Sequence, residues 1–350
     1  MSPHPVARSL VTLGRLRLGV RRTGGTHPTV RSSHGGREEN DPPARLVIEL
    51  ENVTKRYGGK VAVEDLSFTV RTSRVTGLLG PNGAGKSTTM RMILGLHRPT
   101  SGTVRVDGRP FTDDPAPLTA IGAMLDAHAV HPGRSARAHL RSIALTHRLP
   151  ARRVDEVLEL TGLTTVANRR IGTYSLGMGQ RLGIAAALLG TPRTLVLDEP
   201  VNGLDPDGVH WVRELVRSLA SEGTTVLVSS HLMSEMAQTA DDLVVLGRGR
   251  LVAAGPLDQV VASATTGSVR VRTADDPGPL TDALAEAGAG VDRADDDVLT
   301  VTGVPSEHVG ALALRTGTVL AELVPQQASL EQAFFALTKD AVEYTAPEAS

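Results

Sequence analysis

The sequence has 350 residues, of which 40% are hydrophobic, and a formal net charge of −1. This length allows about two domains, and the near-neutral charge gives no support for a protein that binds nucleic acid through a strongly basic surface. The chain has no cysteine, which excludes disulfides, thiolate metal ligands and a cysteine nucleophile. No apolar run approaches the roughly 18–20 residues of a membrane-spanning helix, so we expect a soluble chain or one that reaches a membrane through another protein.

Residues 1–45 differ in composition from the rest of the chain. The segment is rich in Arg, has no acidic residue before Glu38, and shows no periodicity that could build a core. We expect it to be disordered. Alternatively, LGRLRLGVRR forms a membrane-surface arm or a targeting peptide, although no apolar run follows its Arg pair as a secretory signal requires. A further alternative is that translation begins near Val47.

Residues 46–254 alternate β-branched runs with helical patterns, which predicts an α/β domain. LVIELENV and LSFTV indicate strands, and the apolar runs VTGLLG, TLVLDEP and TTVLVSS are typical of buried parallel strands. KSTTMRMILGL continues as a helix, and PDGVHWVRELVRSLASEG has apolar residues at helical spacing up to Gly223. The expected sheet is therefore largely parallel.

Residues 265–340 predict a small α+β accessory domain, followed by a tail at 341–350. Strands are expected at SVRVRTA, GVDRA, VLTVTG and VLAELVP, and helices at PLTDALAEAG, SEHVGALALRTG and SLEQAFFALTKDA. This order describes a split β-α-β unit.

The segment GPNGAGKST fits the phosphate-binding loop G-x-x-x-x-G-K-[ST], and it lies between a predicted strand and a predicted helix. Its glycines let backbone N–H groups close around a β-phosphate, while Lys86 reaches the β and γ oxygens and the Ser87 hydroxyl ligates Mg²⁺. We therefore assign nucleotide binding to the loop residues Gly80, Pro81, Asn82, Gly83, Ala84, Gly85, Lys86, Ser87 and Thr88.

Two further polar groups follow apolar strands. LVLDE places Asp198 at the carboxyl end of a strand, where a carboxylate can hold Mg²⁺, and Glu199 can then polarise an attacking water. His231 follows VLVSS, so its imidazole is expected near the γ-phosphate. These residues predict hydrolysis of a bound triphosphate.

TYSLGMGQR, LVLDEPVNGLDP and VLVSSHLMSE, in this order, resemble the nucleotide-binding subunit of ATP-binding-cassette (ABC) transporters over residues 46–254. The resemblance implies a P-loop NTPase with a RecA-like parallel sheet core, an antiparallel β-subdomain and a helical subdomain. It implies that Tyr57 stacks on the adenine of ATP, that Asp205 is the D-loop residue and that His231 is the switch histidine. It also implies a head-to-tail dimer in which Ser175 and Gly177 of the signature, residues 174–178, complete the nucleotide site of a second copy.

The sequence departs from the family pattern at two positions. Leu176 replaces a glycine of the signature, while Ser175 and Gly177 are retained. Asp126 stands in place of the glutamine that approaches Mg²⁺ and the attacking water. An aspartate offers oxygen ligands and no donor, so we expect a functional but altered Q-loop in which Asp126 is a catalytic-site residue and a Mg²⁺ ligand.

The resemblance implies an ATPase that drives a bacterial exporter of a drug, antibiotic or lipid-like molecule. Such a subunit would lie at the cytoplasmic face of the plasma membrane, held there by a separately encoded permease, with no nucleic-acid partner. One alternative is a soluble cassette that acts as a nucleotide-gated module on the ribosome or DNA. Another alternative is a regulatory subunit whose nucleotide site is inactive, which the departures at Asp126 and Leu176 would favour.

Overall fold

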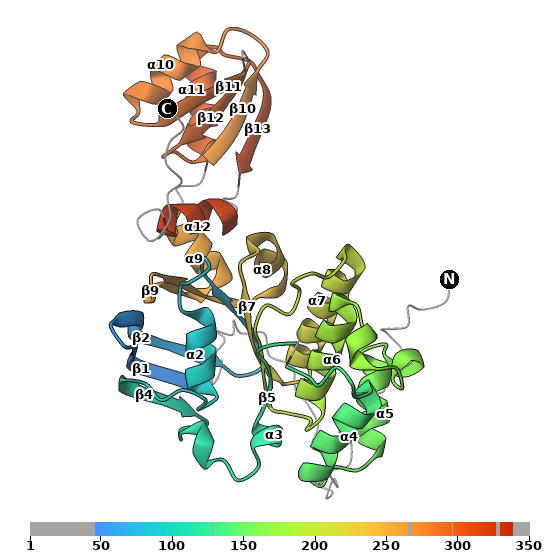
Figure 1. Ribbon diagram of the computed structural model, residues 1–350. Helices are drawn as coiled ribbons and strands as arrows, with labels where there is room; N and C mark the ends of the chain where they lie inside the picture. The colour runs from blue at the N-terminus through green and yellow to red at the C-terminus, as the bar shows by residue number, and fades with distance from the viewer. Residues whose placement is uncertain (1–45, 128, 265–267, 296, 327–329, 339–350) are drawn as a thin grey trace, which may run out of the picture. The chain divides into compact units, whose positions relative to one another are not determined.

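The computed structural model of the chain describes residues 46–127, 129–264, 268–295, 297–326 and 330–338 (Figure 1). The chain divides into two compact units between Leu251 and Val252, and each unit has its own hydrophobic core. The expectations for residues 1–45 and for the tail at 341–350 lie outside the described residues.

A six-stranded sheet of order β5-β6-β7-β3-β8-β9 is the central layer of the α/β fold. Its strands are β3 (Val75–Leu79), β5 (Ile121–Met124), β6 (Thr194–Leu197), β7 (Thr225–Ser230), β8 (Asp242–Gly247) and β9 (Arg250–Pro256). Strand β3 pairs in parallel with β7 and β8, and β6 with β5 and β7. All residues of β3, β6, β7 and β8 are buried, which explains their nearly continuous apolar runs. The carboxyl ends of β3, β6 and β7 meet at one edge of this sheet.

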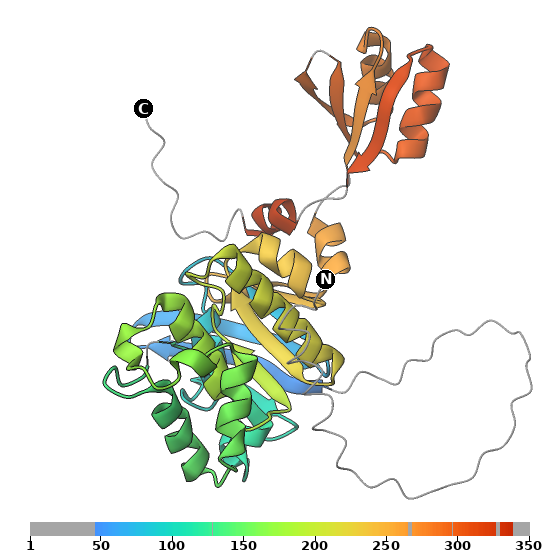
Figure 2. The same ribbon diagram turned by 90° about the vertical axis from the view of Figure 1, so that its right-hand side faces the viewer.

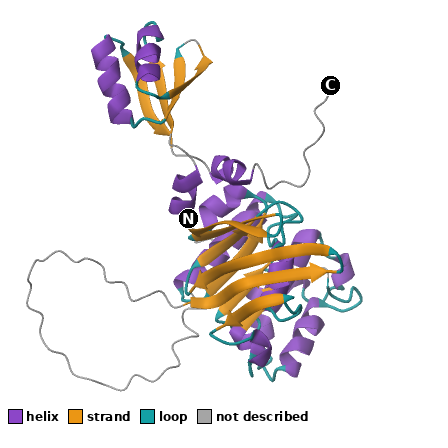
Figure 3. Ribbon diagram, turned by 90° about the vertical axis from the view of Figure 1, so that its left-hand side faces the viewer, coloured by secondary structure: helices purple, strands orange, loops and turns teal. Residues whose placement is uncertain are grey.

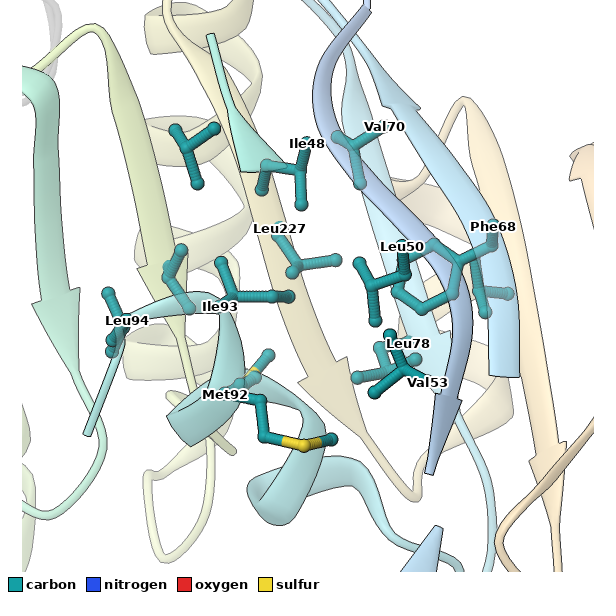
Figure 4. Close-up of a cluster of buried hydrophobic side chains, with 14 of the residues drawn as sticks. Ile48, Leu50, Val53, Phe68, Val70, Leu78, Met92, Ile93, Leu94 and Leu227 are labelled. Atoms are coloured by element: carbon teal, nitrogen blue, oxygen red, sulfur yellow. The ribbon is translucent and has the colours of Figure 1, made fainter. Parts of the chain in front are cut away.

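A three-stranded antiparallel sheet of order β2-β1-β4 accompanies the parallel sheet. It consists of β1 (Leu46–Tyr57), β2 (Lys60–Arg71) and β4 (Ser101–Val106). Figure 4 shows Leu50 of β1 in one buried cluster with Ile93, at the end of helix α2 (Lys86–Ile93), and with Leu227 of β7. This packing fixes α2, and the loop that precedes it, against both sheets.

A helical subdomain forms from α4 (Ala136–Thr146), α5 (Arg152–Leu160) and α6 (Leu176–Leu188), which pack on one another. Helix α4 begins where Ser135 Oγ accepts a hydrogen bond from Ala138 N at 3.2 Å, a standard N-cap. The structure also describes α3 (Pro117–Ala120), α7 (Pro206–Ser221) and α8 (Met233–Thr239) in the first unit. Within the described residues, no helix combines the length and hydrophobicity needed to cross a bilayer.

The second unit contains a four-stranded antiparallel sheet of order β11-β12-β10-β13. Its elements are β10 (Ser268–Thr273), α10 (Gly278–Glu286), β11 (Gly290–Asp295), β12 (Val298–Thr302), α11 (Ser306–Thr316) and β13 (Leu320–Gln326). Figures 2 and 3 show both helices on the same face of this sheet. Leu280 and Leu284 of α10 pack there against Val271 and Val301 of the strands. The expected split β-α-β arrangement is confirmed.

The last described helix, α12 (Leu330–Thr338), packs against α9 (Leu257–Ala264). Phe334 of α12 and Val260 of α9 are buried. Helix α12 was expected from the sequence, whereas α9, which precedes the predicted accessory domain at 265–340, was missed. Its eight residues are too few to show a helical period clearly.

Candidate active site

The phosphate loop joins β3 to α2, and its glycines are required by the backbone. Gly85, the N-cap of α2, has φ 100°, and a Cβ atom there would lie 2.9 Å from the Ala62 carbonyl oxygen. A Cβ at Gly80 would lie 2.7 Å from the Leu246 carbonyl oxygen. The Lys86 ammonium donates to the carbonyl oxygens of Gly80, at 2.6 Å, and Pro81, at 3.3 Å. The backbone carbonyls of the loop thus bind the buried side chain of Lys86.

Glu199 bridges Lys86 and His231. Its Oε1 lies 3.6 Å from Lys86 Nζ, and its Oε2 lies 2.8 Å from His231 Nδ1. These residues come from segments far apart in the sequence, which meet because β3, β6 and β7 end at the same sheet edge. Lys86 is buried, Glu199 half-buried and His231 exposed, so the cluster opens to solvent on the side of the histidine.

Ser229 holds the two acidic residues in place. Its hydroxyl donates to Asp198 Oδ1 at 2.6 Å and accepts a hydrogen bond from Glu199 N at 2.9 Å. On the other side, Asp198 N donates to the Met124 carbonyl at the end of β5, at 2.8 Å. Ser229 is fully buried and was missed by the sequence analysis. A hydroxyl at the end of the apolar run TTVLVSS was the signal that could have revealed it.

Glu199 has an unusual backbone, with φ 49°, in the left-handed region that non-glycine residues rarely occupy. Such a conformation costs about 1–3 kcal/mol and persists where neighbouring contacts enforce it. The hydrogen bond from Glu199 N to Ser229 and the contacts of its carboxylate with Lys86 and His231 are such contacts.

The donor set fits a magnesium ion that is shared with phosphate. Ser87 and Asp198, both half-buried, offer oxygen ligands, and Asp198 keeps Oδ2 beside the Oδ1 that Ser229 occupies. Among the described residues, no group of three or more His, Cys, Asp or Glu could hold a metal by itself. Mg²⁺ typically takes one or two protein oxygens and completes its shell with phosphates and water, so this sparse set suits it.

Ser175 and Asp205 each begin a helix. Ser175 Oγ accepts from Met178 N at 3.2 Å at the start of α6, and Asp205 Oδ1 accepts from Gly208 N at 2.9 Å at the start of α7. Both residues are exposed, and within the described chain neither bonds to Lys86, Glu199 or His231.

The signature and the D-loop contact each other inside one chain. A Cβ atom at Gly203 would lie 1.9 Å from Leu176 Cδ2, and one at Gly177 would lie 3.1 Å from Leu204 Cδ2. Each segment therefore places a leucine on a glycine of the other. Leu176, which departs from the family pattern, makes the closer of these contacts.

Tyr57 and Asp126 lie in two other segments. Tyr57 ends β1 with 44% of its surface exposed, and its hydroxyl forms a hydrogen bond with His97 Nδ1. His97 was not singled out by the sequence analysis. Asp126 is exposed in the segment after β5, two residues beyond Met124, whose carbonyl binds Asp198 N. Asp126 therefore lies two residues along the chain from the backbone carbonyl that binds Asp198 N.

Comparisons with known proteins agree with this site. The ABC transporter family matches residues 63–202, and a domain of unknown function (DUF8746) matches residues 267–331. The chain is 41% identical over 219 residues to the bacitracin transport ATP-binding protein BcrA of Bacillus licheniformis, covering 61% of this chain and 71% of that protein. It is 34% identical over 296 residues to a Nod factor export ATP-binding protein of Burkholderia lata, covering 83% of this chain and 96% of that protein.

A solved structure is also similar. The dimeric, post-hydrolysis structure of the ATP-binding cassette MJ0796, bound to ADP and Pi, matches with a TM-score of 0.56 and 25% identity, over 60% of this chain and 98% of that one. The P-loop fold and the nucleotide-binding character implied by the sequence resemblance are confirmed. The chain belongs to the ABC transporter ATP-binding proteins, and it is an ATPase that binds and hydrolyses ATP.

Proposed function

We propose that this chain is the ATP-hydrolysing subunit of a bacterial exporter and drives transport through a separately encoded permease. The observation that carries the proposal is the bridge of Glu199 between Lys86 and His231, which gathers a phosphate-binding cation, a carboxylate base and an imidazole at one sheet edge. The export and bacitracin transport named for two relatives support the direction and the class of cargo.

In the proposed mechanism, Lys86 binds the β- and γ-phosphate oxygens and neutralises charge that develops during phosphoryl transfer. Glu199 orients and polarises the attacking water, and His231 contacts both Glu199 and the γ-phosphate. Asp198 and Ser87 would hold Mg²⁺, which would supply positive charge to stabilise phosphoryl transfer. Asp126 lies in the segment after β5 and is the further oxygen ligand that we assign to this ion.

The proposed active unit is a head-to-tail dimer. Ser175 and Asp205 are exposed at helix starts, where their side chains accept hydrogen bonds from the helix backbone, so a second copy can approach them. Helix N-termini attract phosphate, so a triphosphate bound between two chains would hold the chains together. The dimer of the MJ0796 cassette supports this arrangement.

The proposed location is the cytoplasmic face of the plasma membrane, and the proposed cargo is a drug, antibiotic or lipid-like compound. Cargo contacts would belong to the permease. The test is to co-express the chain with candidate permeases, purify the complex, and screen compounds for stimulation of its ATPase activity. Stimulation by an exported compound, absent with Glu199→Gln, is expected. Co-purification with ribosomes or DNA instead would overturn the exporter assignment.

A further inference from the structure

We propose that His97 is a positioning residue for Tyr57, holding its ring ready to stack on the adenine of ATP. The inference rests on the proposed stacking role of Tyr57 and adds a second residue to the base-binding part of the site. Its basis is an interaction between a side chain at the end of β1 and one in the segment after α2.

The contact between the two side chains is specific in two ways. A hydrogen bond joins the Tyr57 hydroxyl to His97 Nδ1. The two rings also meet edge to face, with centroids 5.6 Å apart and planes at 75°. An edge-to-face pair leaves the broad face of one ring uncovered by the other. With 44% of its surface exposed, Tyr57 keeps room for a stacked base.

His97 can hold Tyr57 because its own backbone is fixed. His97 N donates to the Arg91 carbonyl of α2 at 3.2 Å, and Leu96 N donates to the same oxygen at 2.9 Å. The segment that follows is attached to β1, since Thr100 N donates to the Thr54 carbonyl at 2.7 Å. Helix α2 therefore begins at the phosphate loop, and the segment that follows it carries the residue that holds Tyr57.

Lys55 adds a second restraint on the same ring. Its ammonium lies 5.0 Å from the centroid of Tyr57 and donates to the Arg98 carbonyl at 2.7 Å. The ring is thus held by a hydrogen bond at its hydroxyl and by a cation at its π system. When a ligand orders a mobile side chain, the lost conformational entropy weakens binding. A ring that is already ordered before the ligand binds avoids this cost and binds its ligand more tightly.

His97 should therefore contribute to the affinity for the adenine base of ATP and not to the affinity for its phosphates. His97→Ala should weaken ATP binding by about 3- to 10-fold, the value of a single hydrogen bond. Binding of tripolyphosphate, which has no base, should keep its wild-type dissociation constant. Tyr57→Phe, which retains the ring and removes the hydroxyl, should give a similar loss, and the double variant should lose no more than either single variant.

The experiment measures dissociation constants of ATP and tripolyphosphate by calorimetry on the full chain. The variants are His97→Ala, Tyr57→Phe, their combination, Tyr57→Ala and the neighbouring Leu96→Ala, whose side chain is 63% exposed and serves as the control. Thermal unfolding of each variant shows whether it is folded. His97→Asn, which retains a polar side chain, serves as a second variant if His97→Ala fails to fold.

Two results separate this inference from the proposed function. If Tyr57→Ala binds ATP like the wild type, the stacking role of Tyr57 is wrong. If Tyr57→Ala weakens ATP binding while His97→Ala and Tyr57→Phe do not, Tyr57 stacks without help and the positioning role of His97 is overturned. Equal losses for ATP and tripolyphosphate in His97→Ala would also overturn it, since the effect would then not concern the base.

Discussion

The side chain of Leu176 lies directly on the backbone of Gly203, so closely that a Cβ atom at Gly203 would be 1.9 Å from Leu176 Cδ2. Gly203 also has φ 71°, a conformation that favours glycine. The residue that departs from the family pattern in the signature therefore makes the closer of the two contacts that join the signature to the D-loop.

This contact predicts that Leu176→Gly reduces the destabilisation caused by Gly203→Ala. Gly203→Ala should lower the free energy of unfolding by about 1–3 kcal/mol, because the new methyl group overlaps Leu176 in addition to its φ cost. Combined with Leu176→Gly, the same substitution should cost less, since the overlap is removed. Urea unfolding measures each value. Gly108→Ala is the matched control: Gly108 has φ 80° and no atom within 4 Å of its added Cβ, so it reports the φ cost alone. Equal costs of Gly203→Ala in both backgrounds would contradict the prediction.

Glu199→Gln should lower the ATPase rate by about 10²–10⁴-fold, the usual contribution of a general base. Gln keeps the size of Glu but replaces one carboxylate oxygen by an amide donor and cannot take a proton, so ATP should bind without being hydrolysed. The variant should then form a stable dimer with ATP and Mg²⁺, measured by light scattering, and a monomer with ADP. A Glu199→Gln protein that stays monomeric with ATP would rule out the dimer model.

Asp126→Gln restores the side chain expected from the family pattern and should change the magnesium dependence of the ATPase. Removing a carboxylate from the ion's surroundings should raise the Mg²⁺ concentration needed for half-maximal rate. A magnesium titration of ATPase activity measures the shift, with Asp207→Asn, an exposed acid on α7, as the control. An unchanged titration and rate in Asp126→Gln would show that Asp126 does not act on the ion.

His139 predicts a pH-dependent stability of the helical subdomain. Burial, with a smaller contribution from Arg134, lowers the pKa of His139 on α4. Below its ordinary pKa of about 6.5, the unfolded chain binds a proton that the folded chain does not, so stability is full above this pH. It should fall as the pH drops from there to the lowered pKa of the folded state. Unfolding curves should show a smaller fall for His139→Gln. The exposed His210→Gln provides the control, and an identical change in both variants would contradict the assignment.

Much of the fold could be predicted because its signals are local. The buried strands β3, β6 and β7 follow from continuous apolar runs, and the phosphate loop follows from the spacing of its glycines and lysine. Helix α9 could not be assigned, because its burial depends on α12, more than 60 residues later in the chain.

The missed site residues depend on contacts distant in sequence. Ser229 acts on Asp198 only because β6 and β7 are neighbours, and His97 meets Tyr57 because β1 is attached to the segment after α2. Neither pair has a characteristic spacing in the sequence. The meeting of Lys86, Glu199 and His231 could be anticipated, since residues that follow parallel strands share a sheet edge.

The left-handed backbone of Glu199 has a consequence for how variants of this protein would be selected. At φ 49°, glycine or asparagine would suit the chain better than glutamate, so Glu199→Gly and Glu199→Asn are candidates for a more stable protein. Both would lack the carboxylate that faces Lys86 and His231. A screen for thermal stability alone would therefore enrich inactive variants of Glu199. A screen for activity would retain glutamate despite the cost of its backbone conformation.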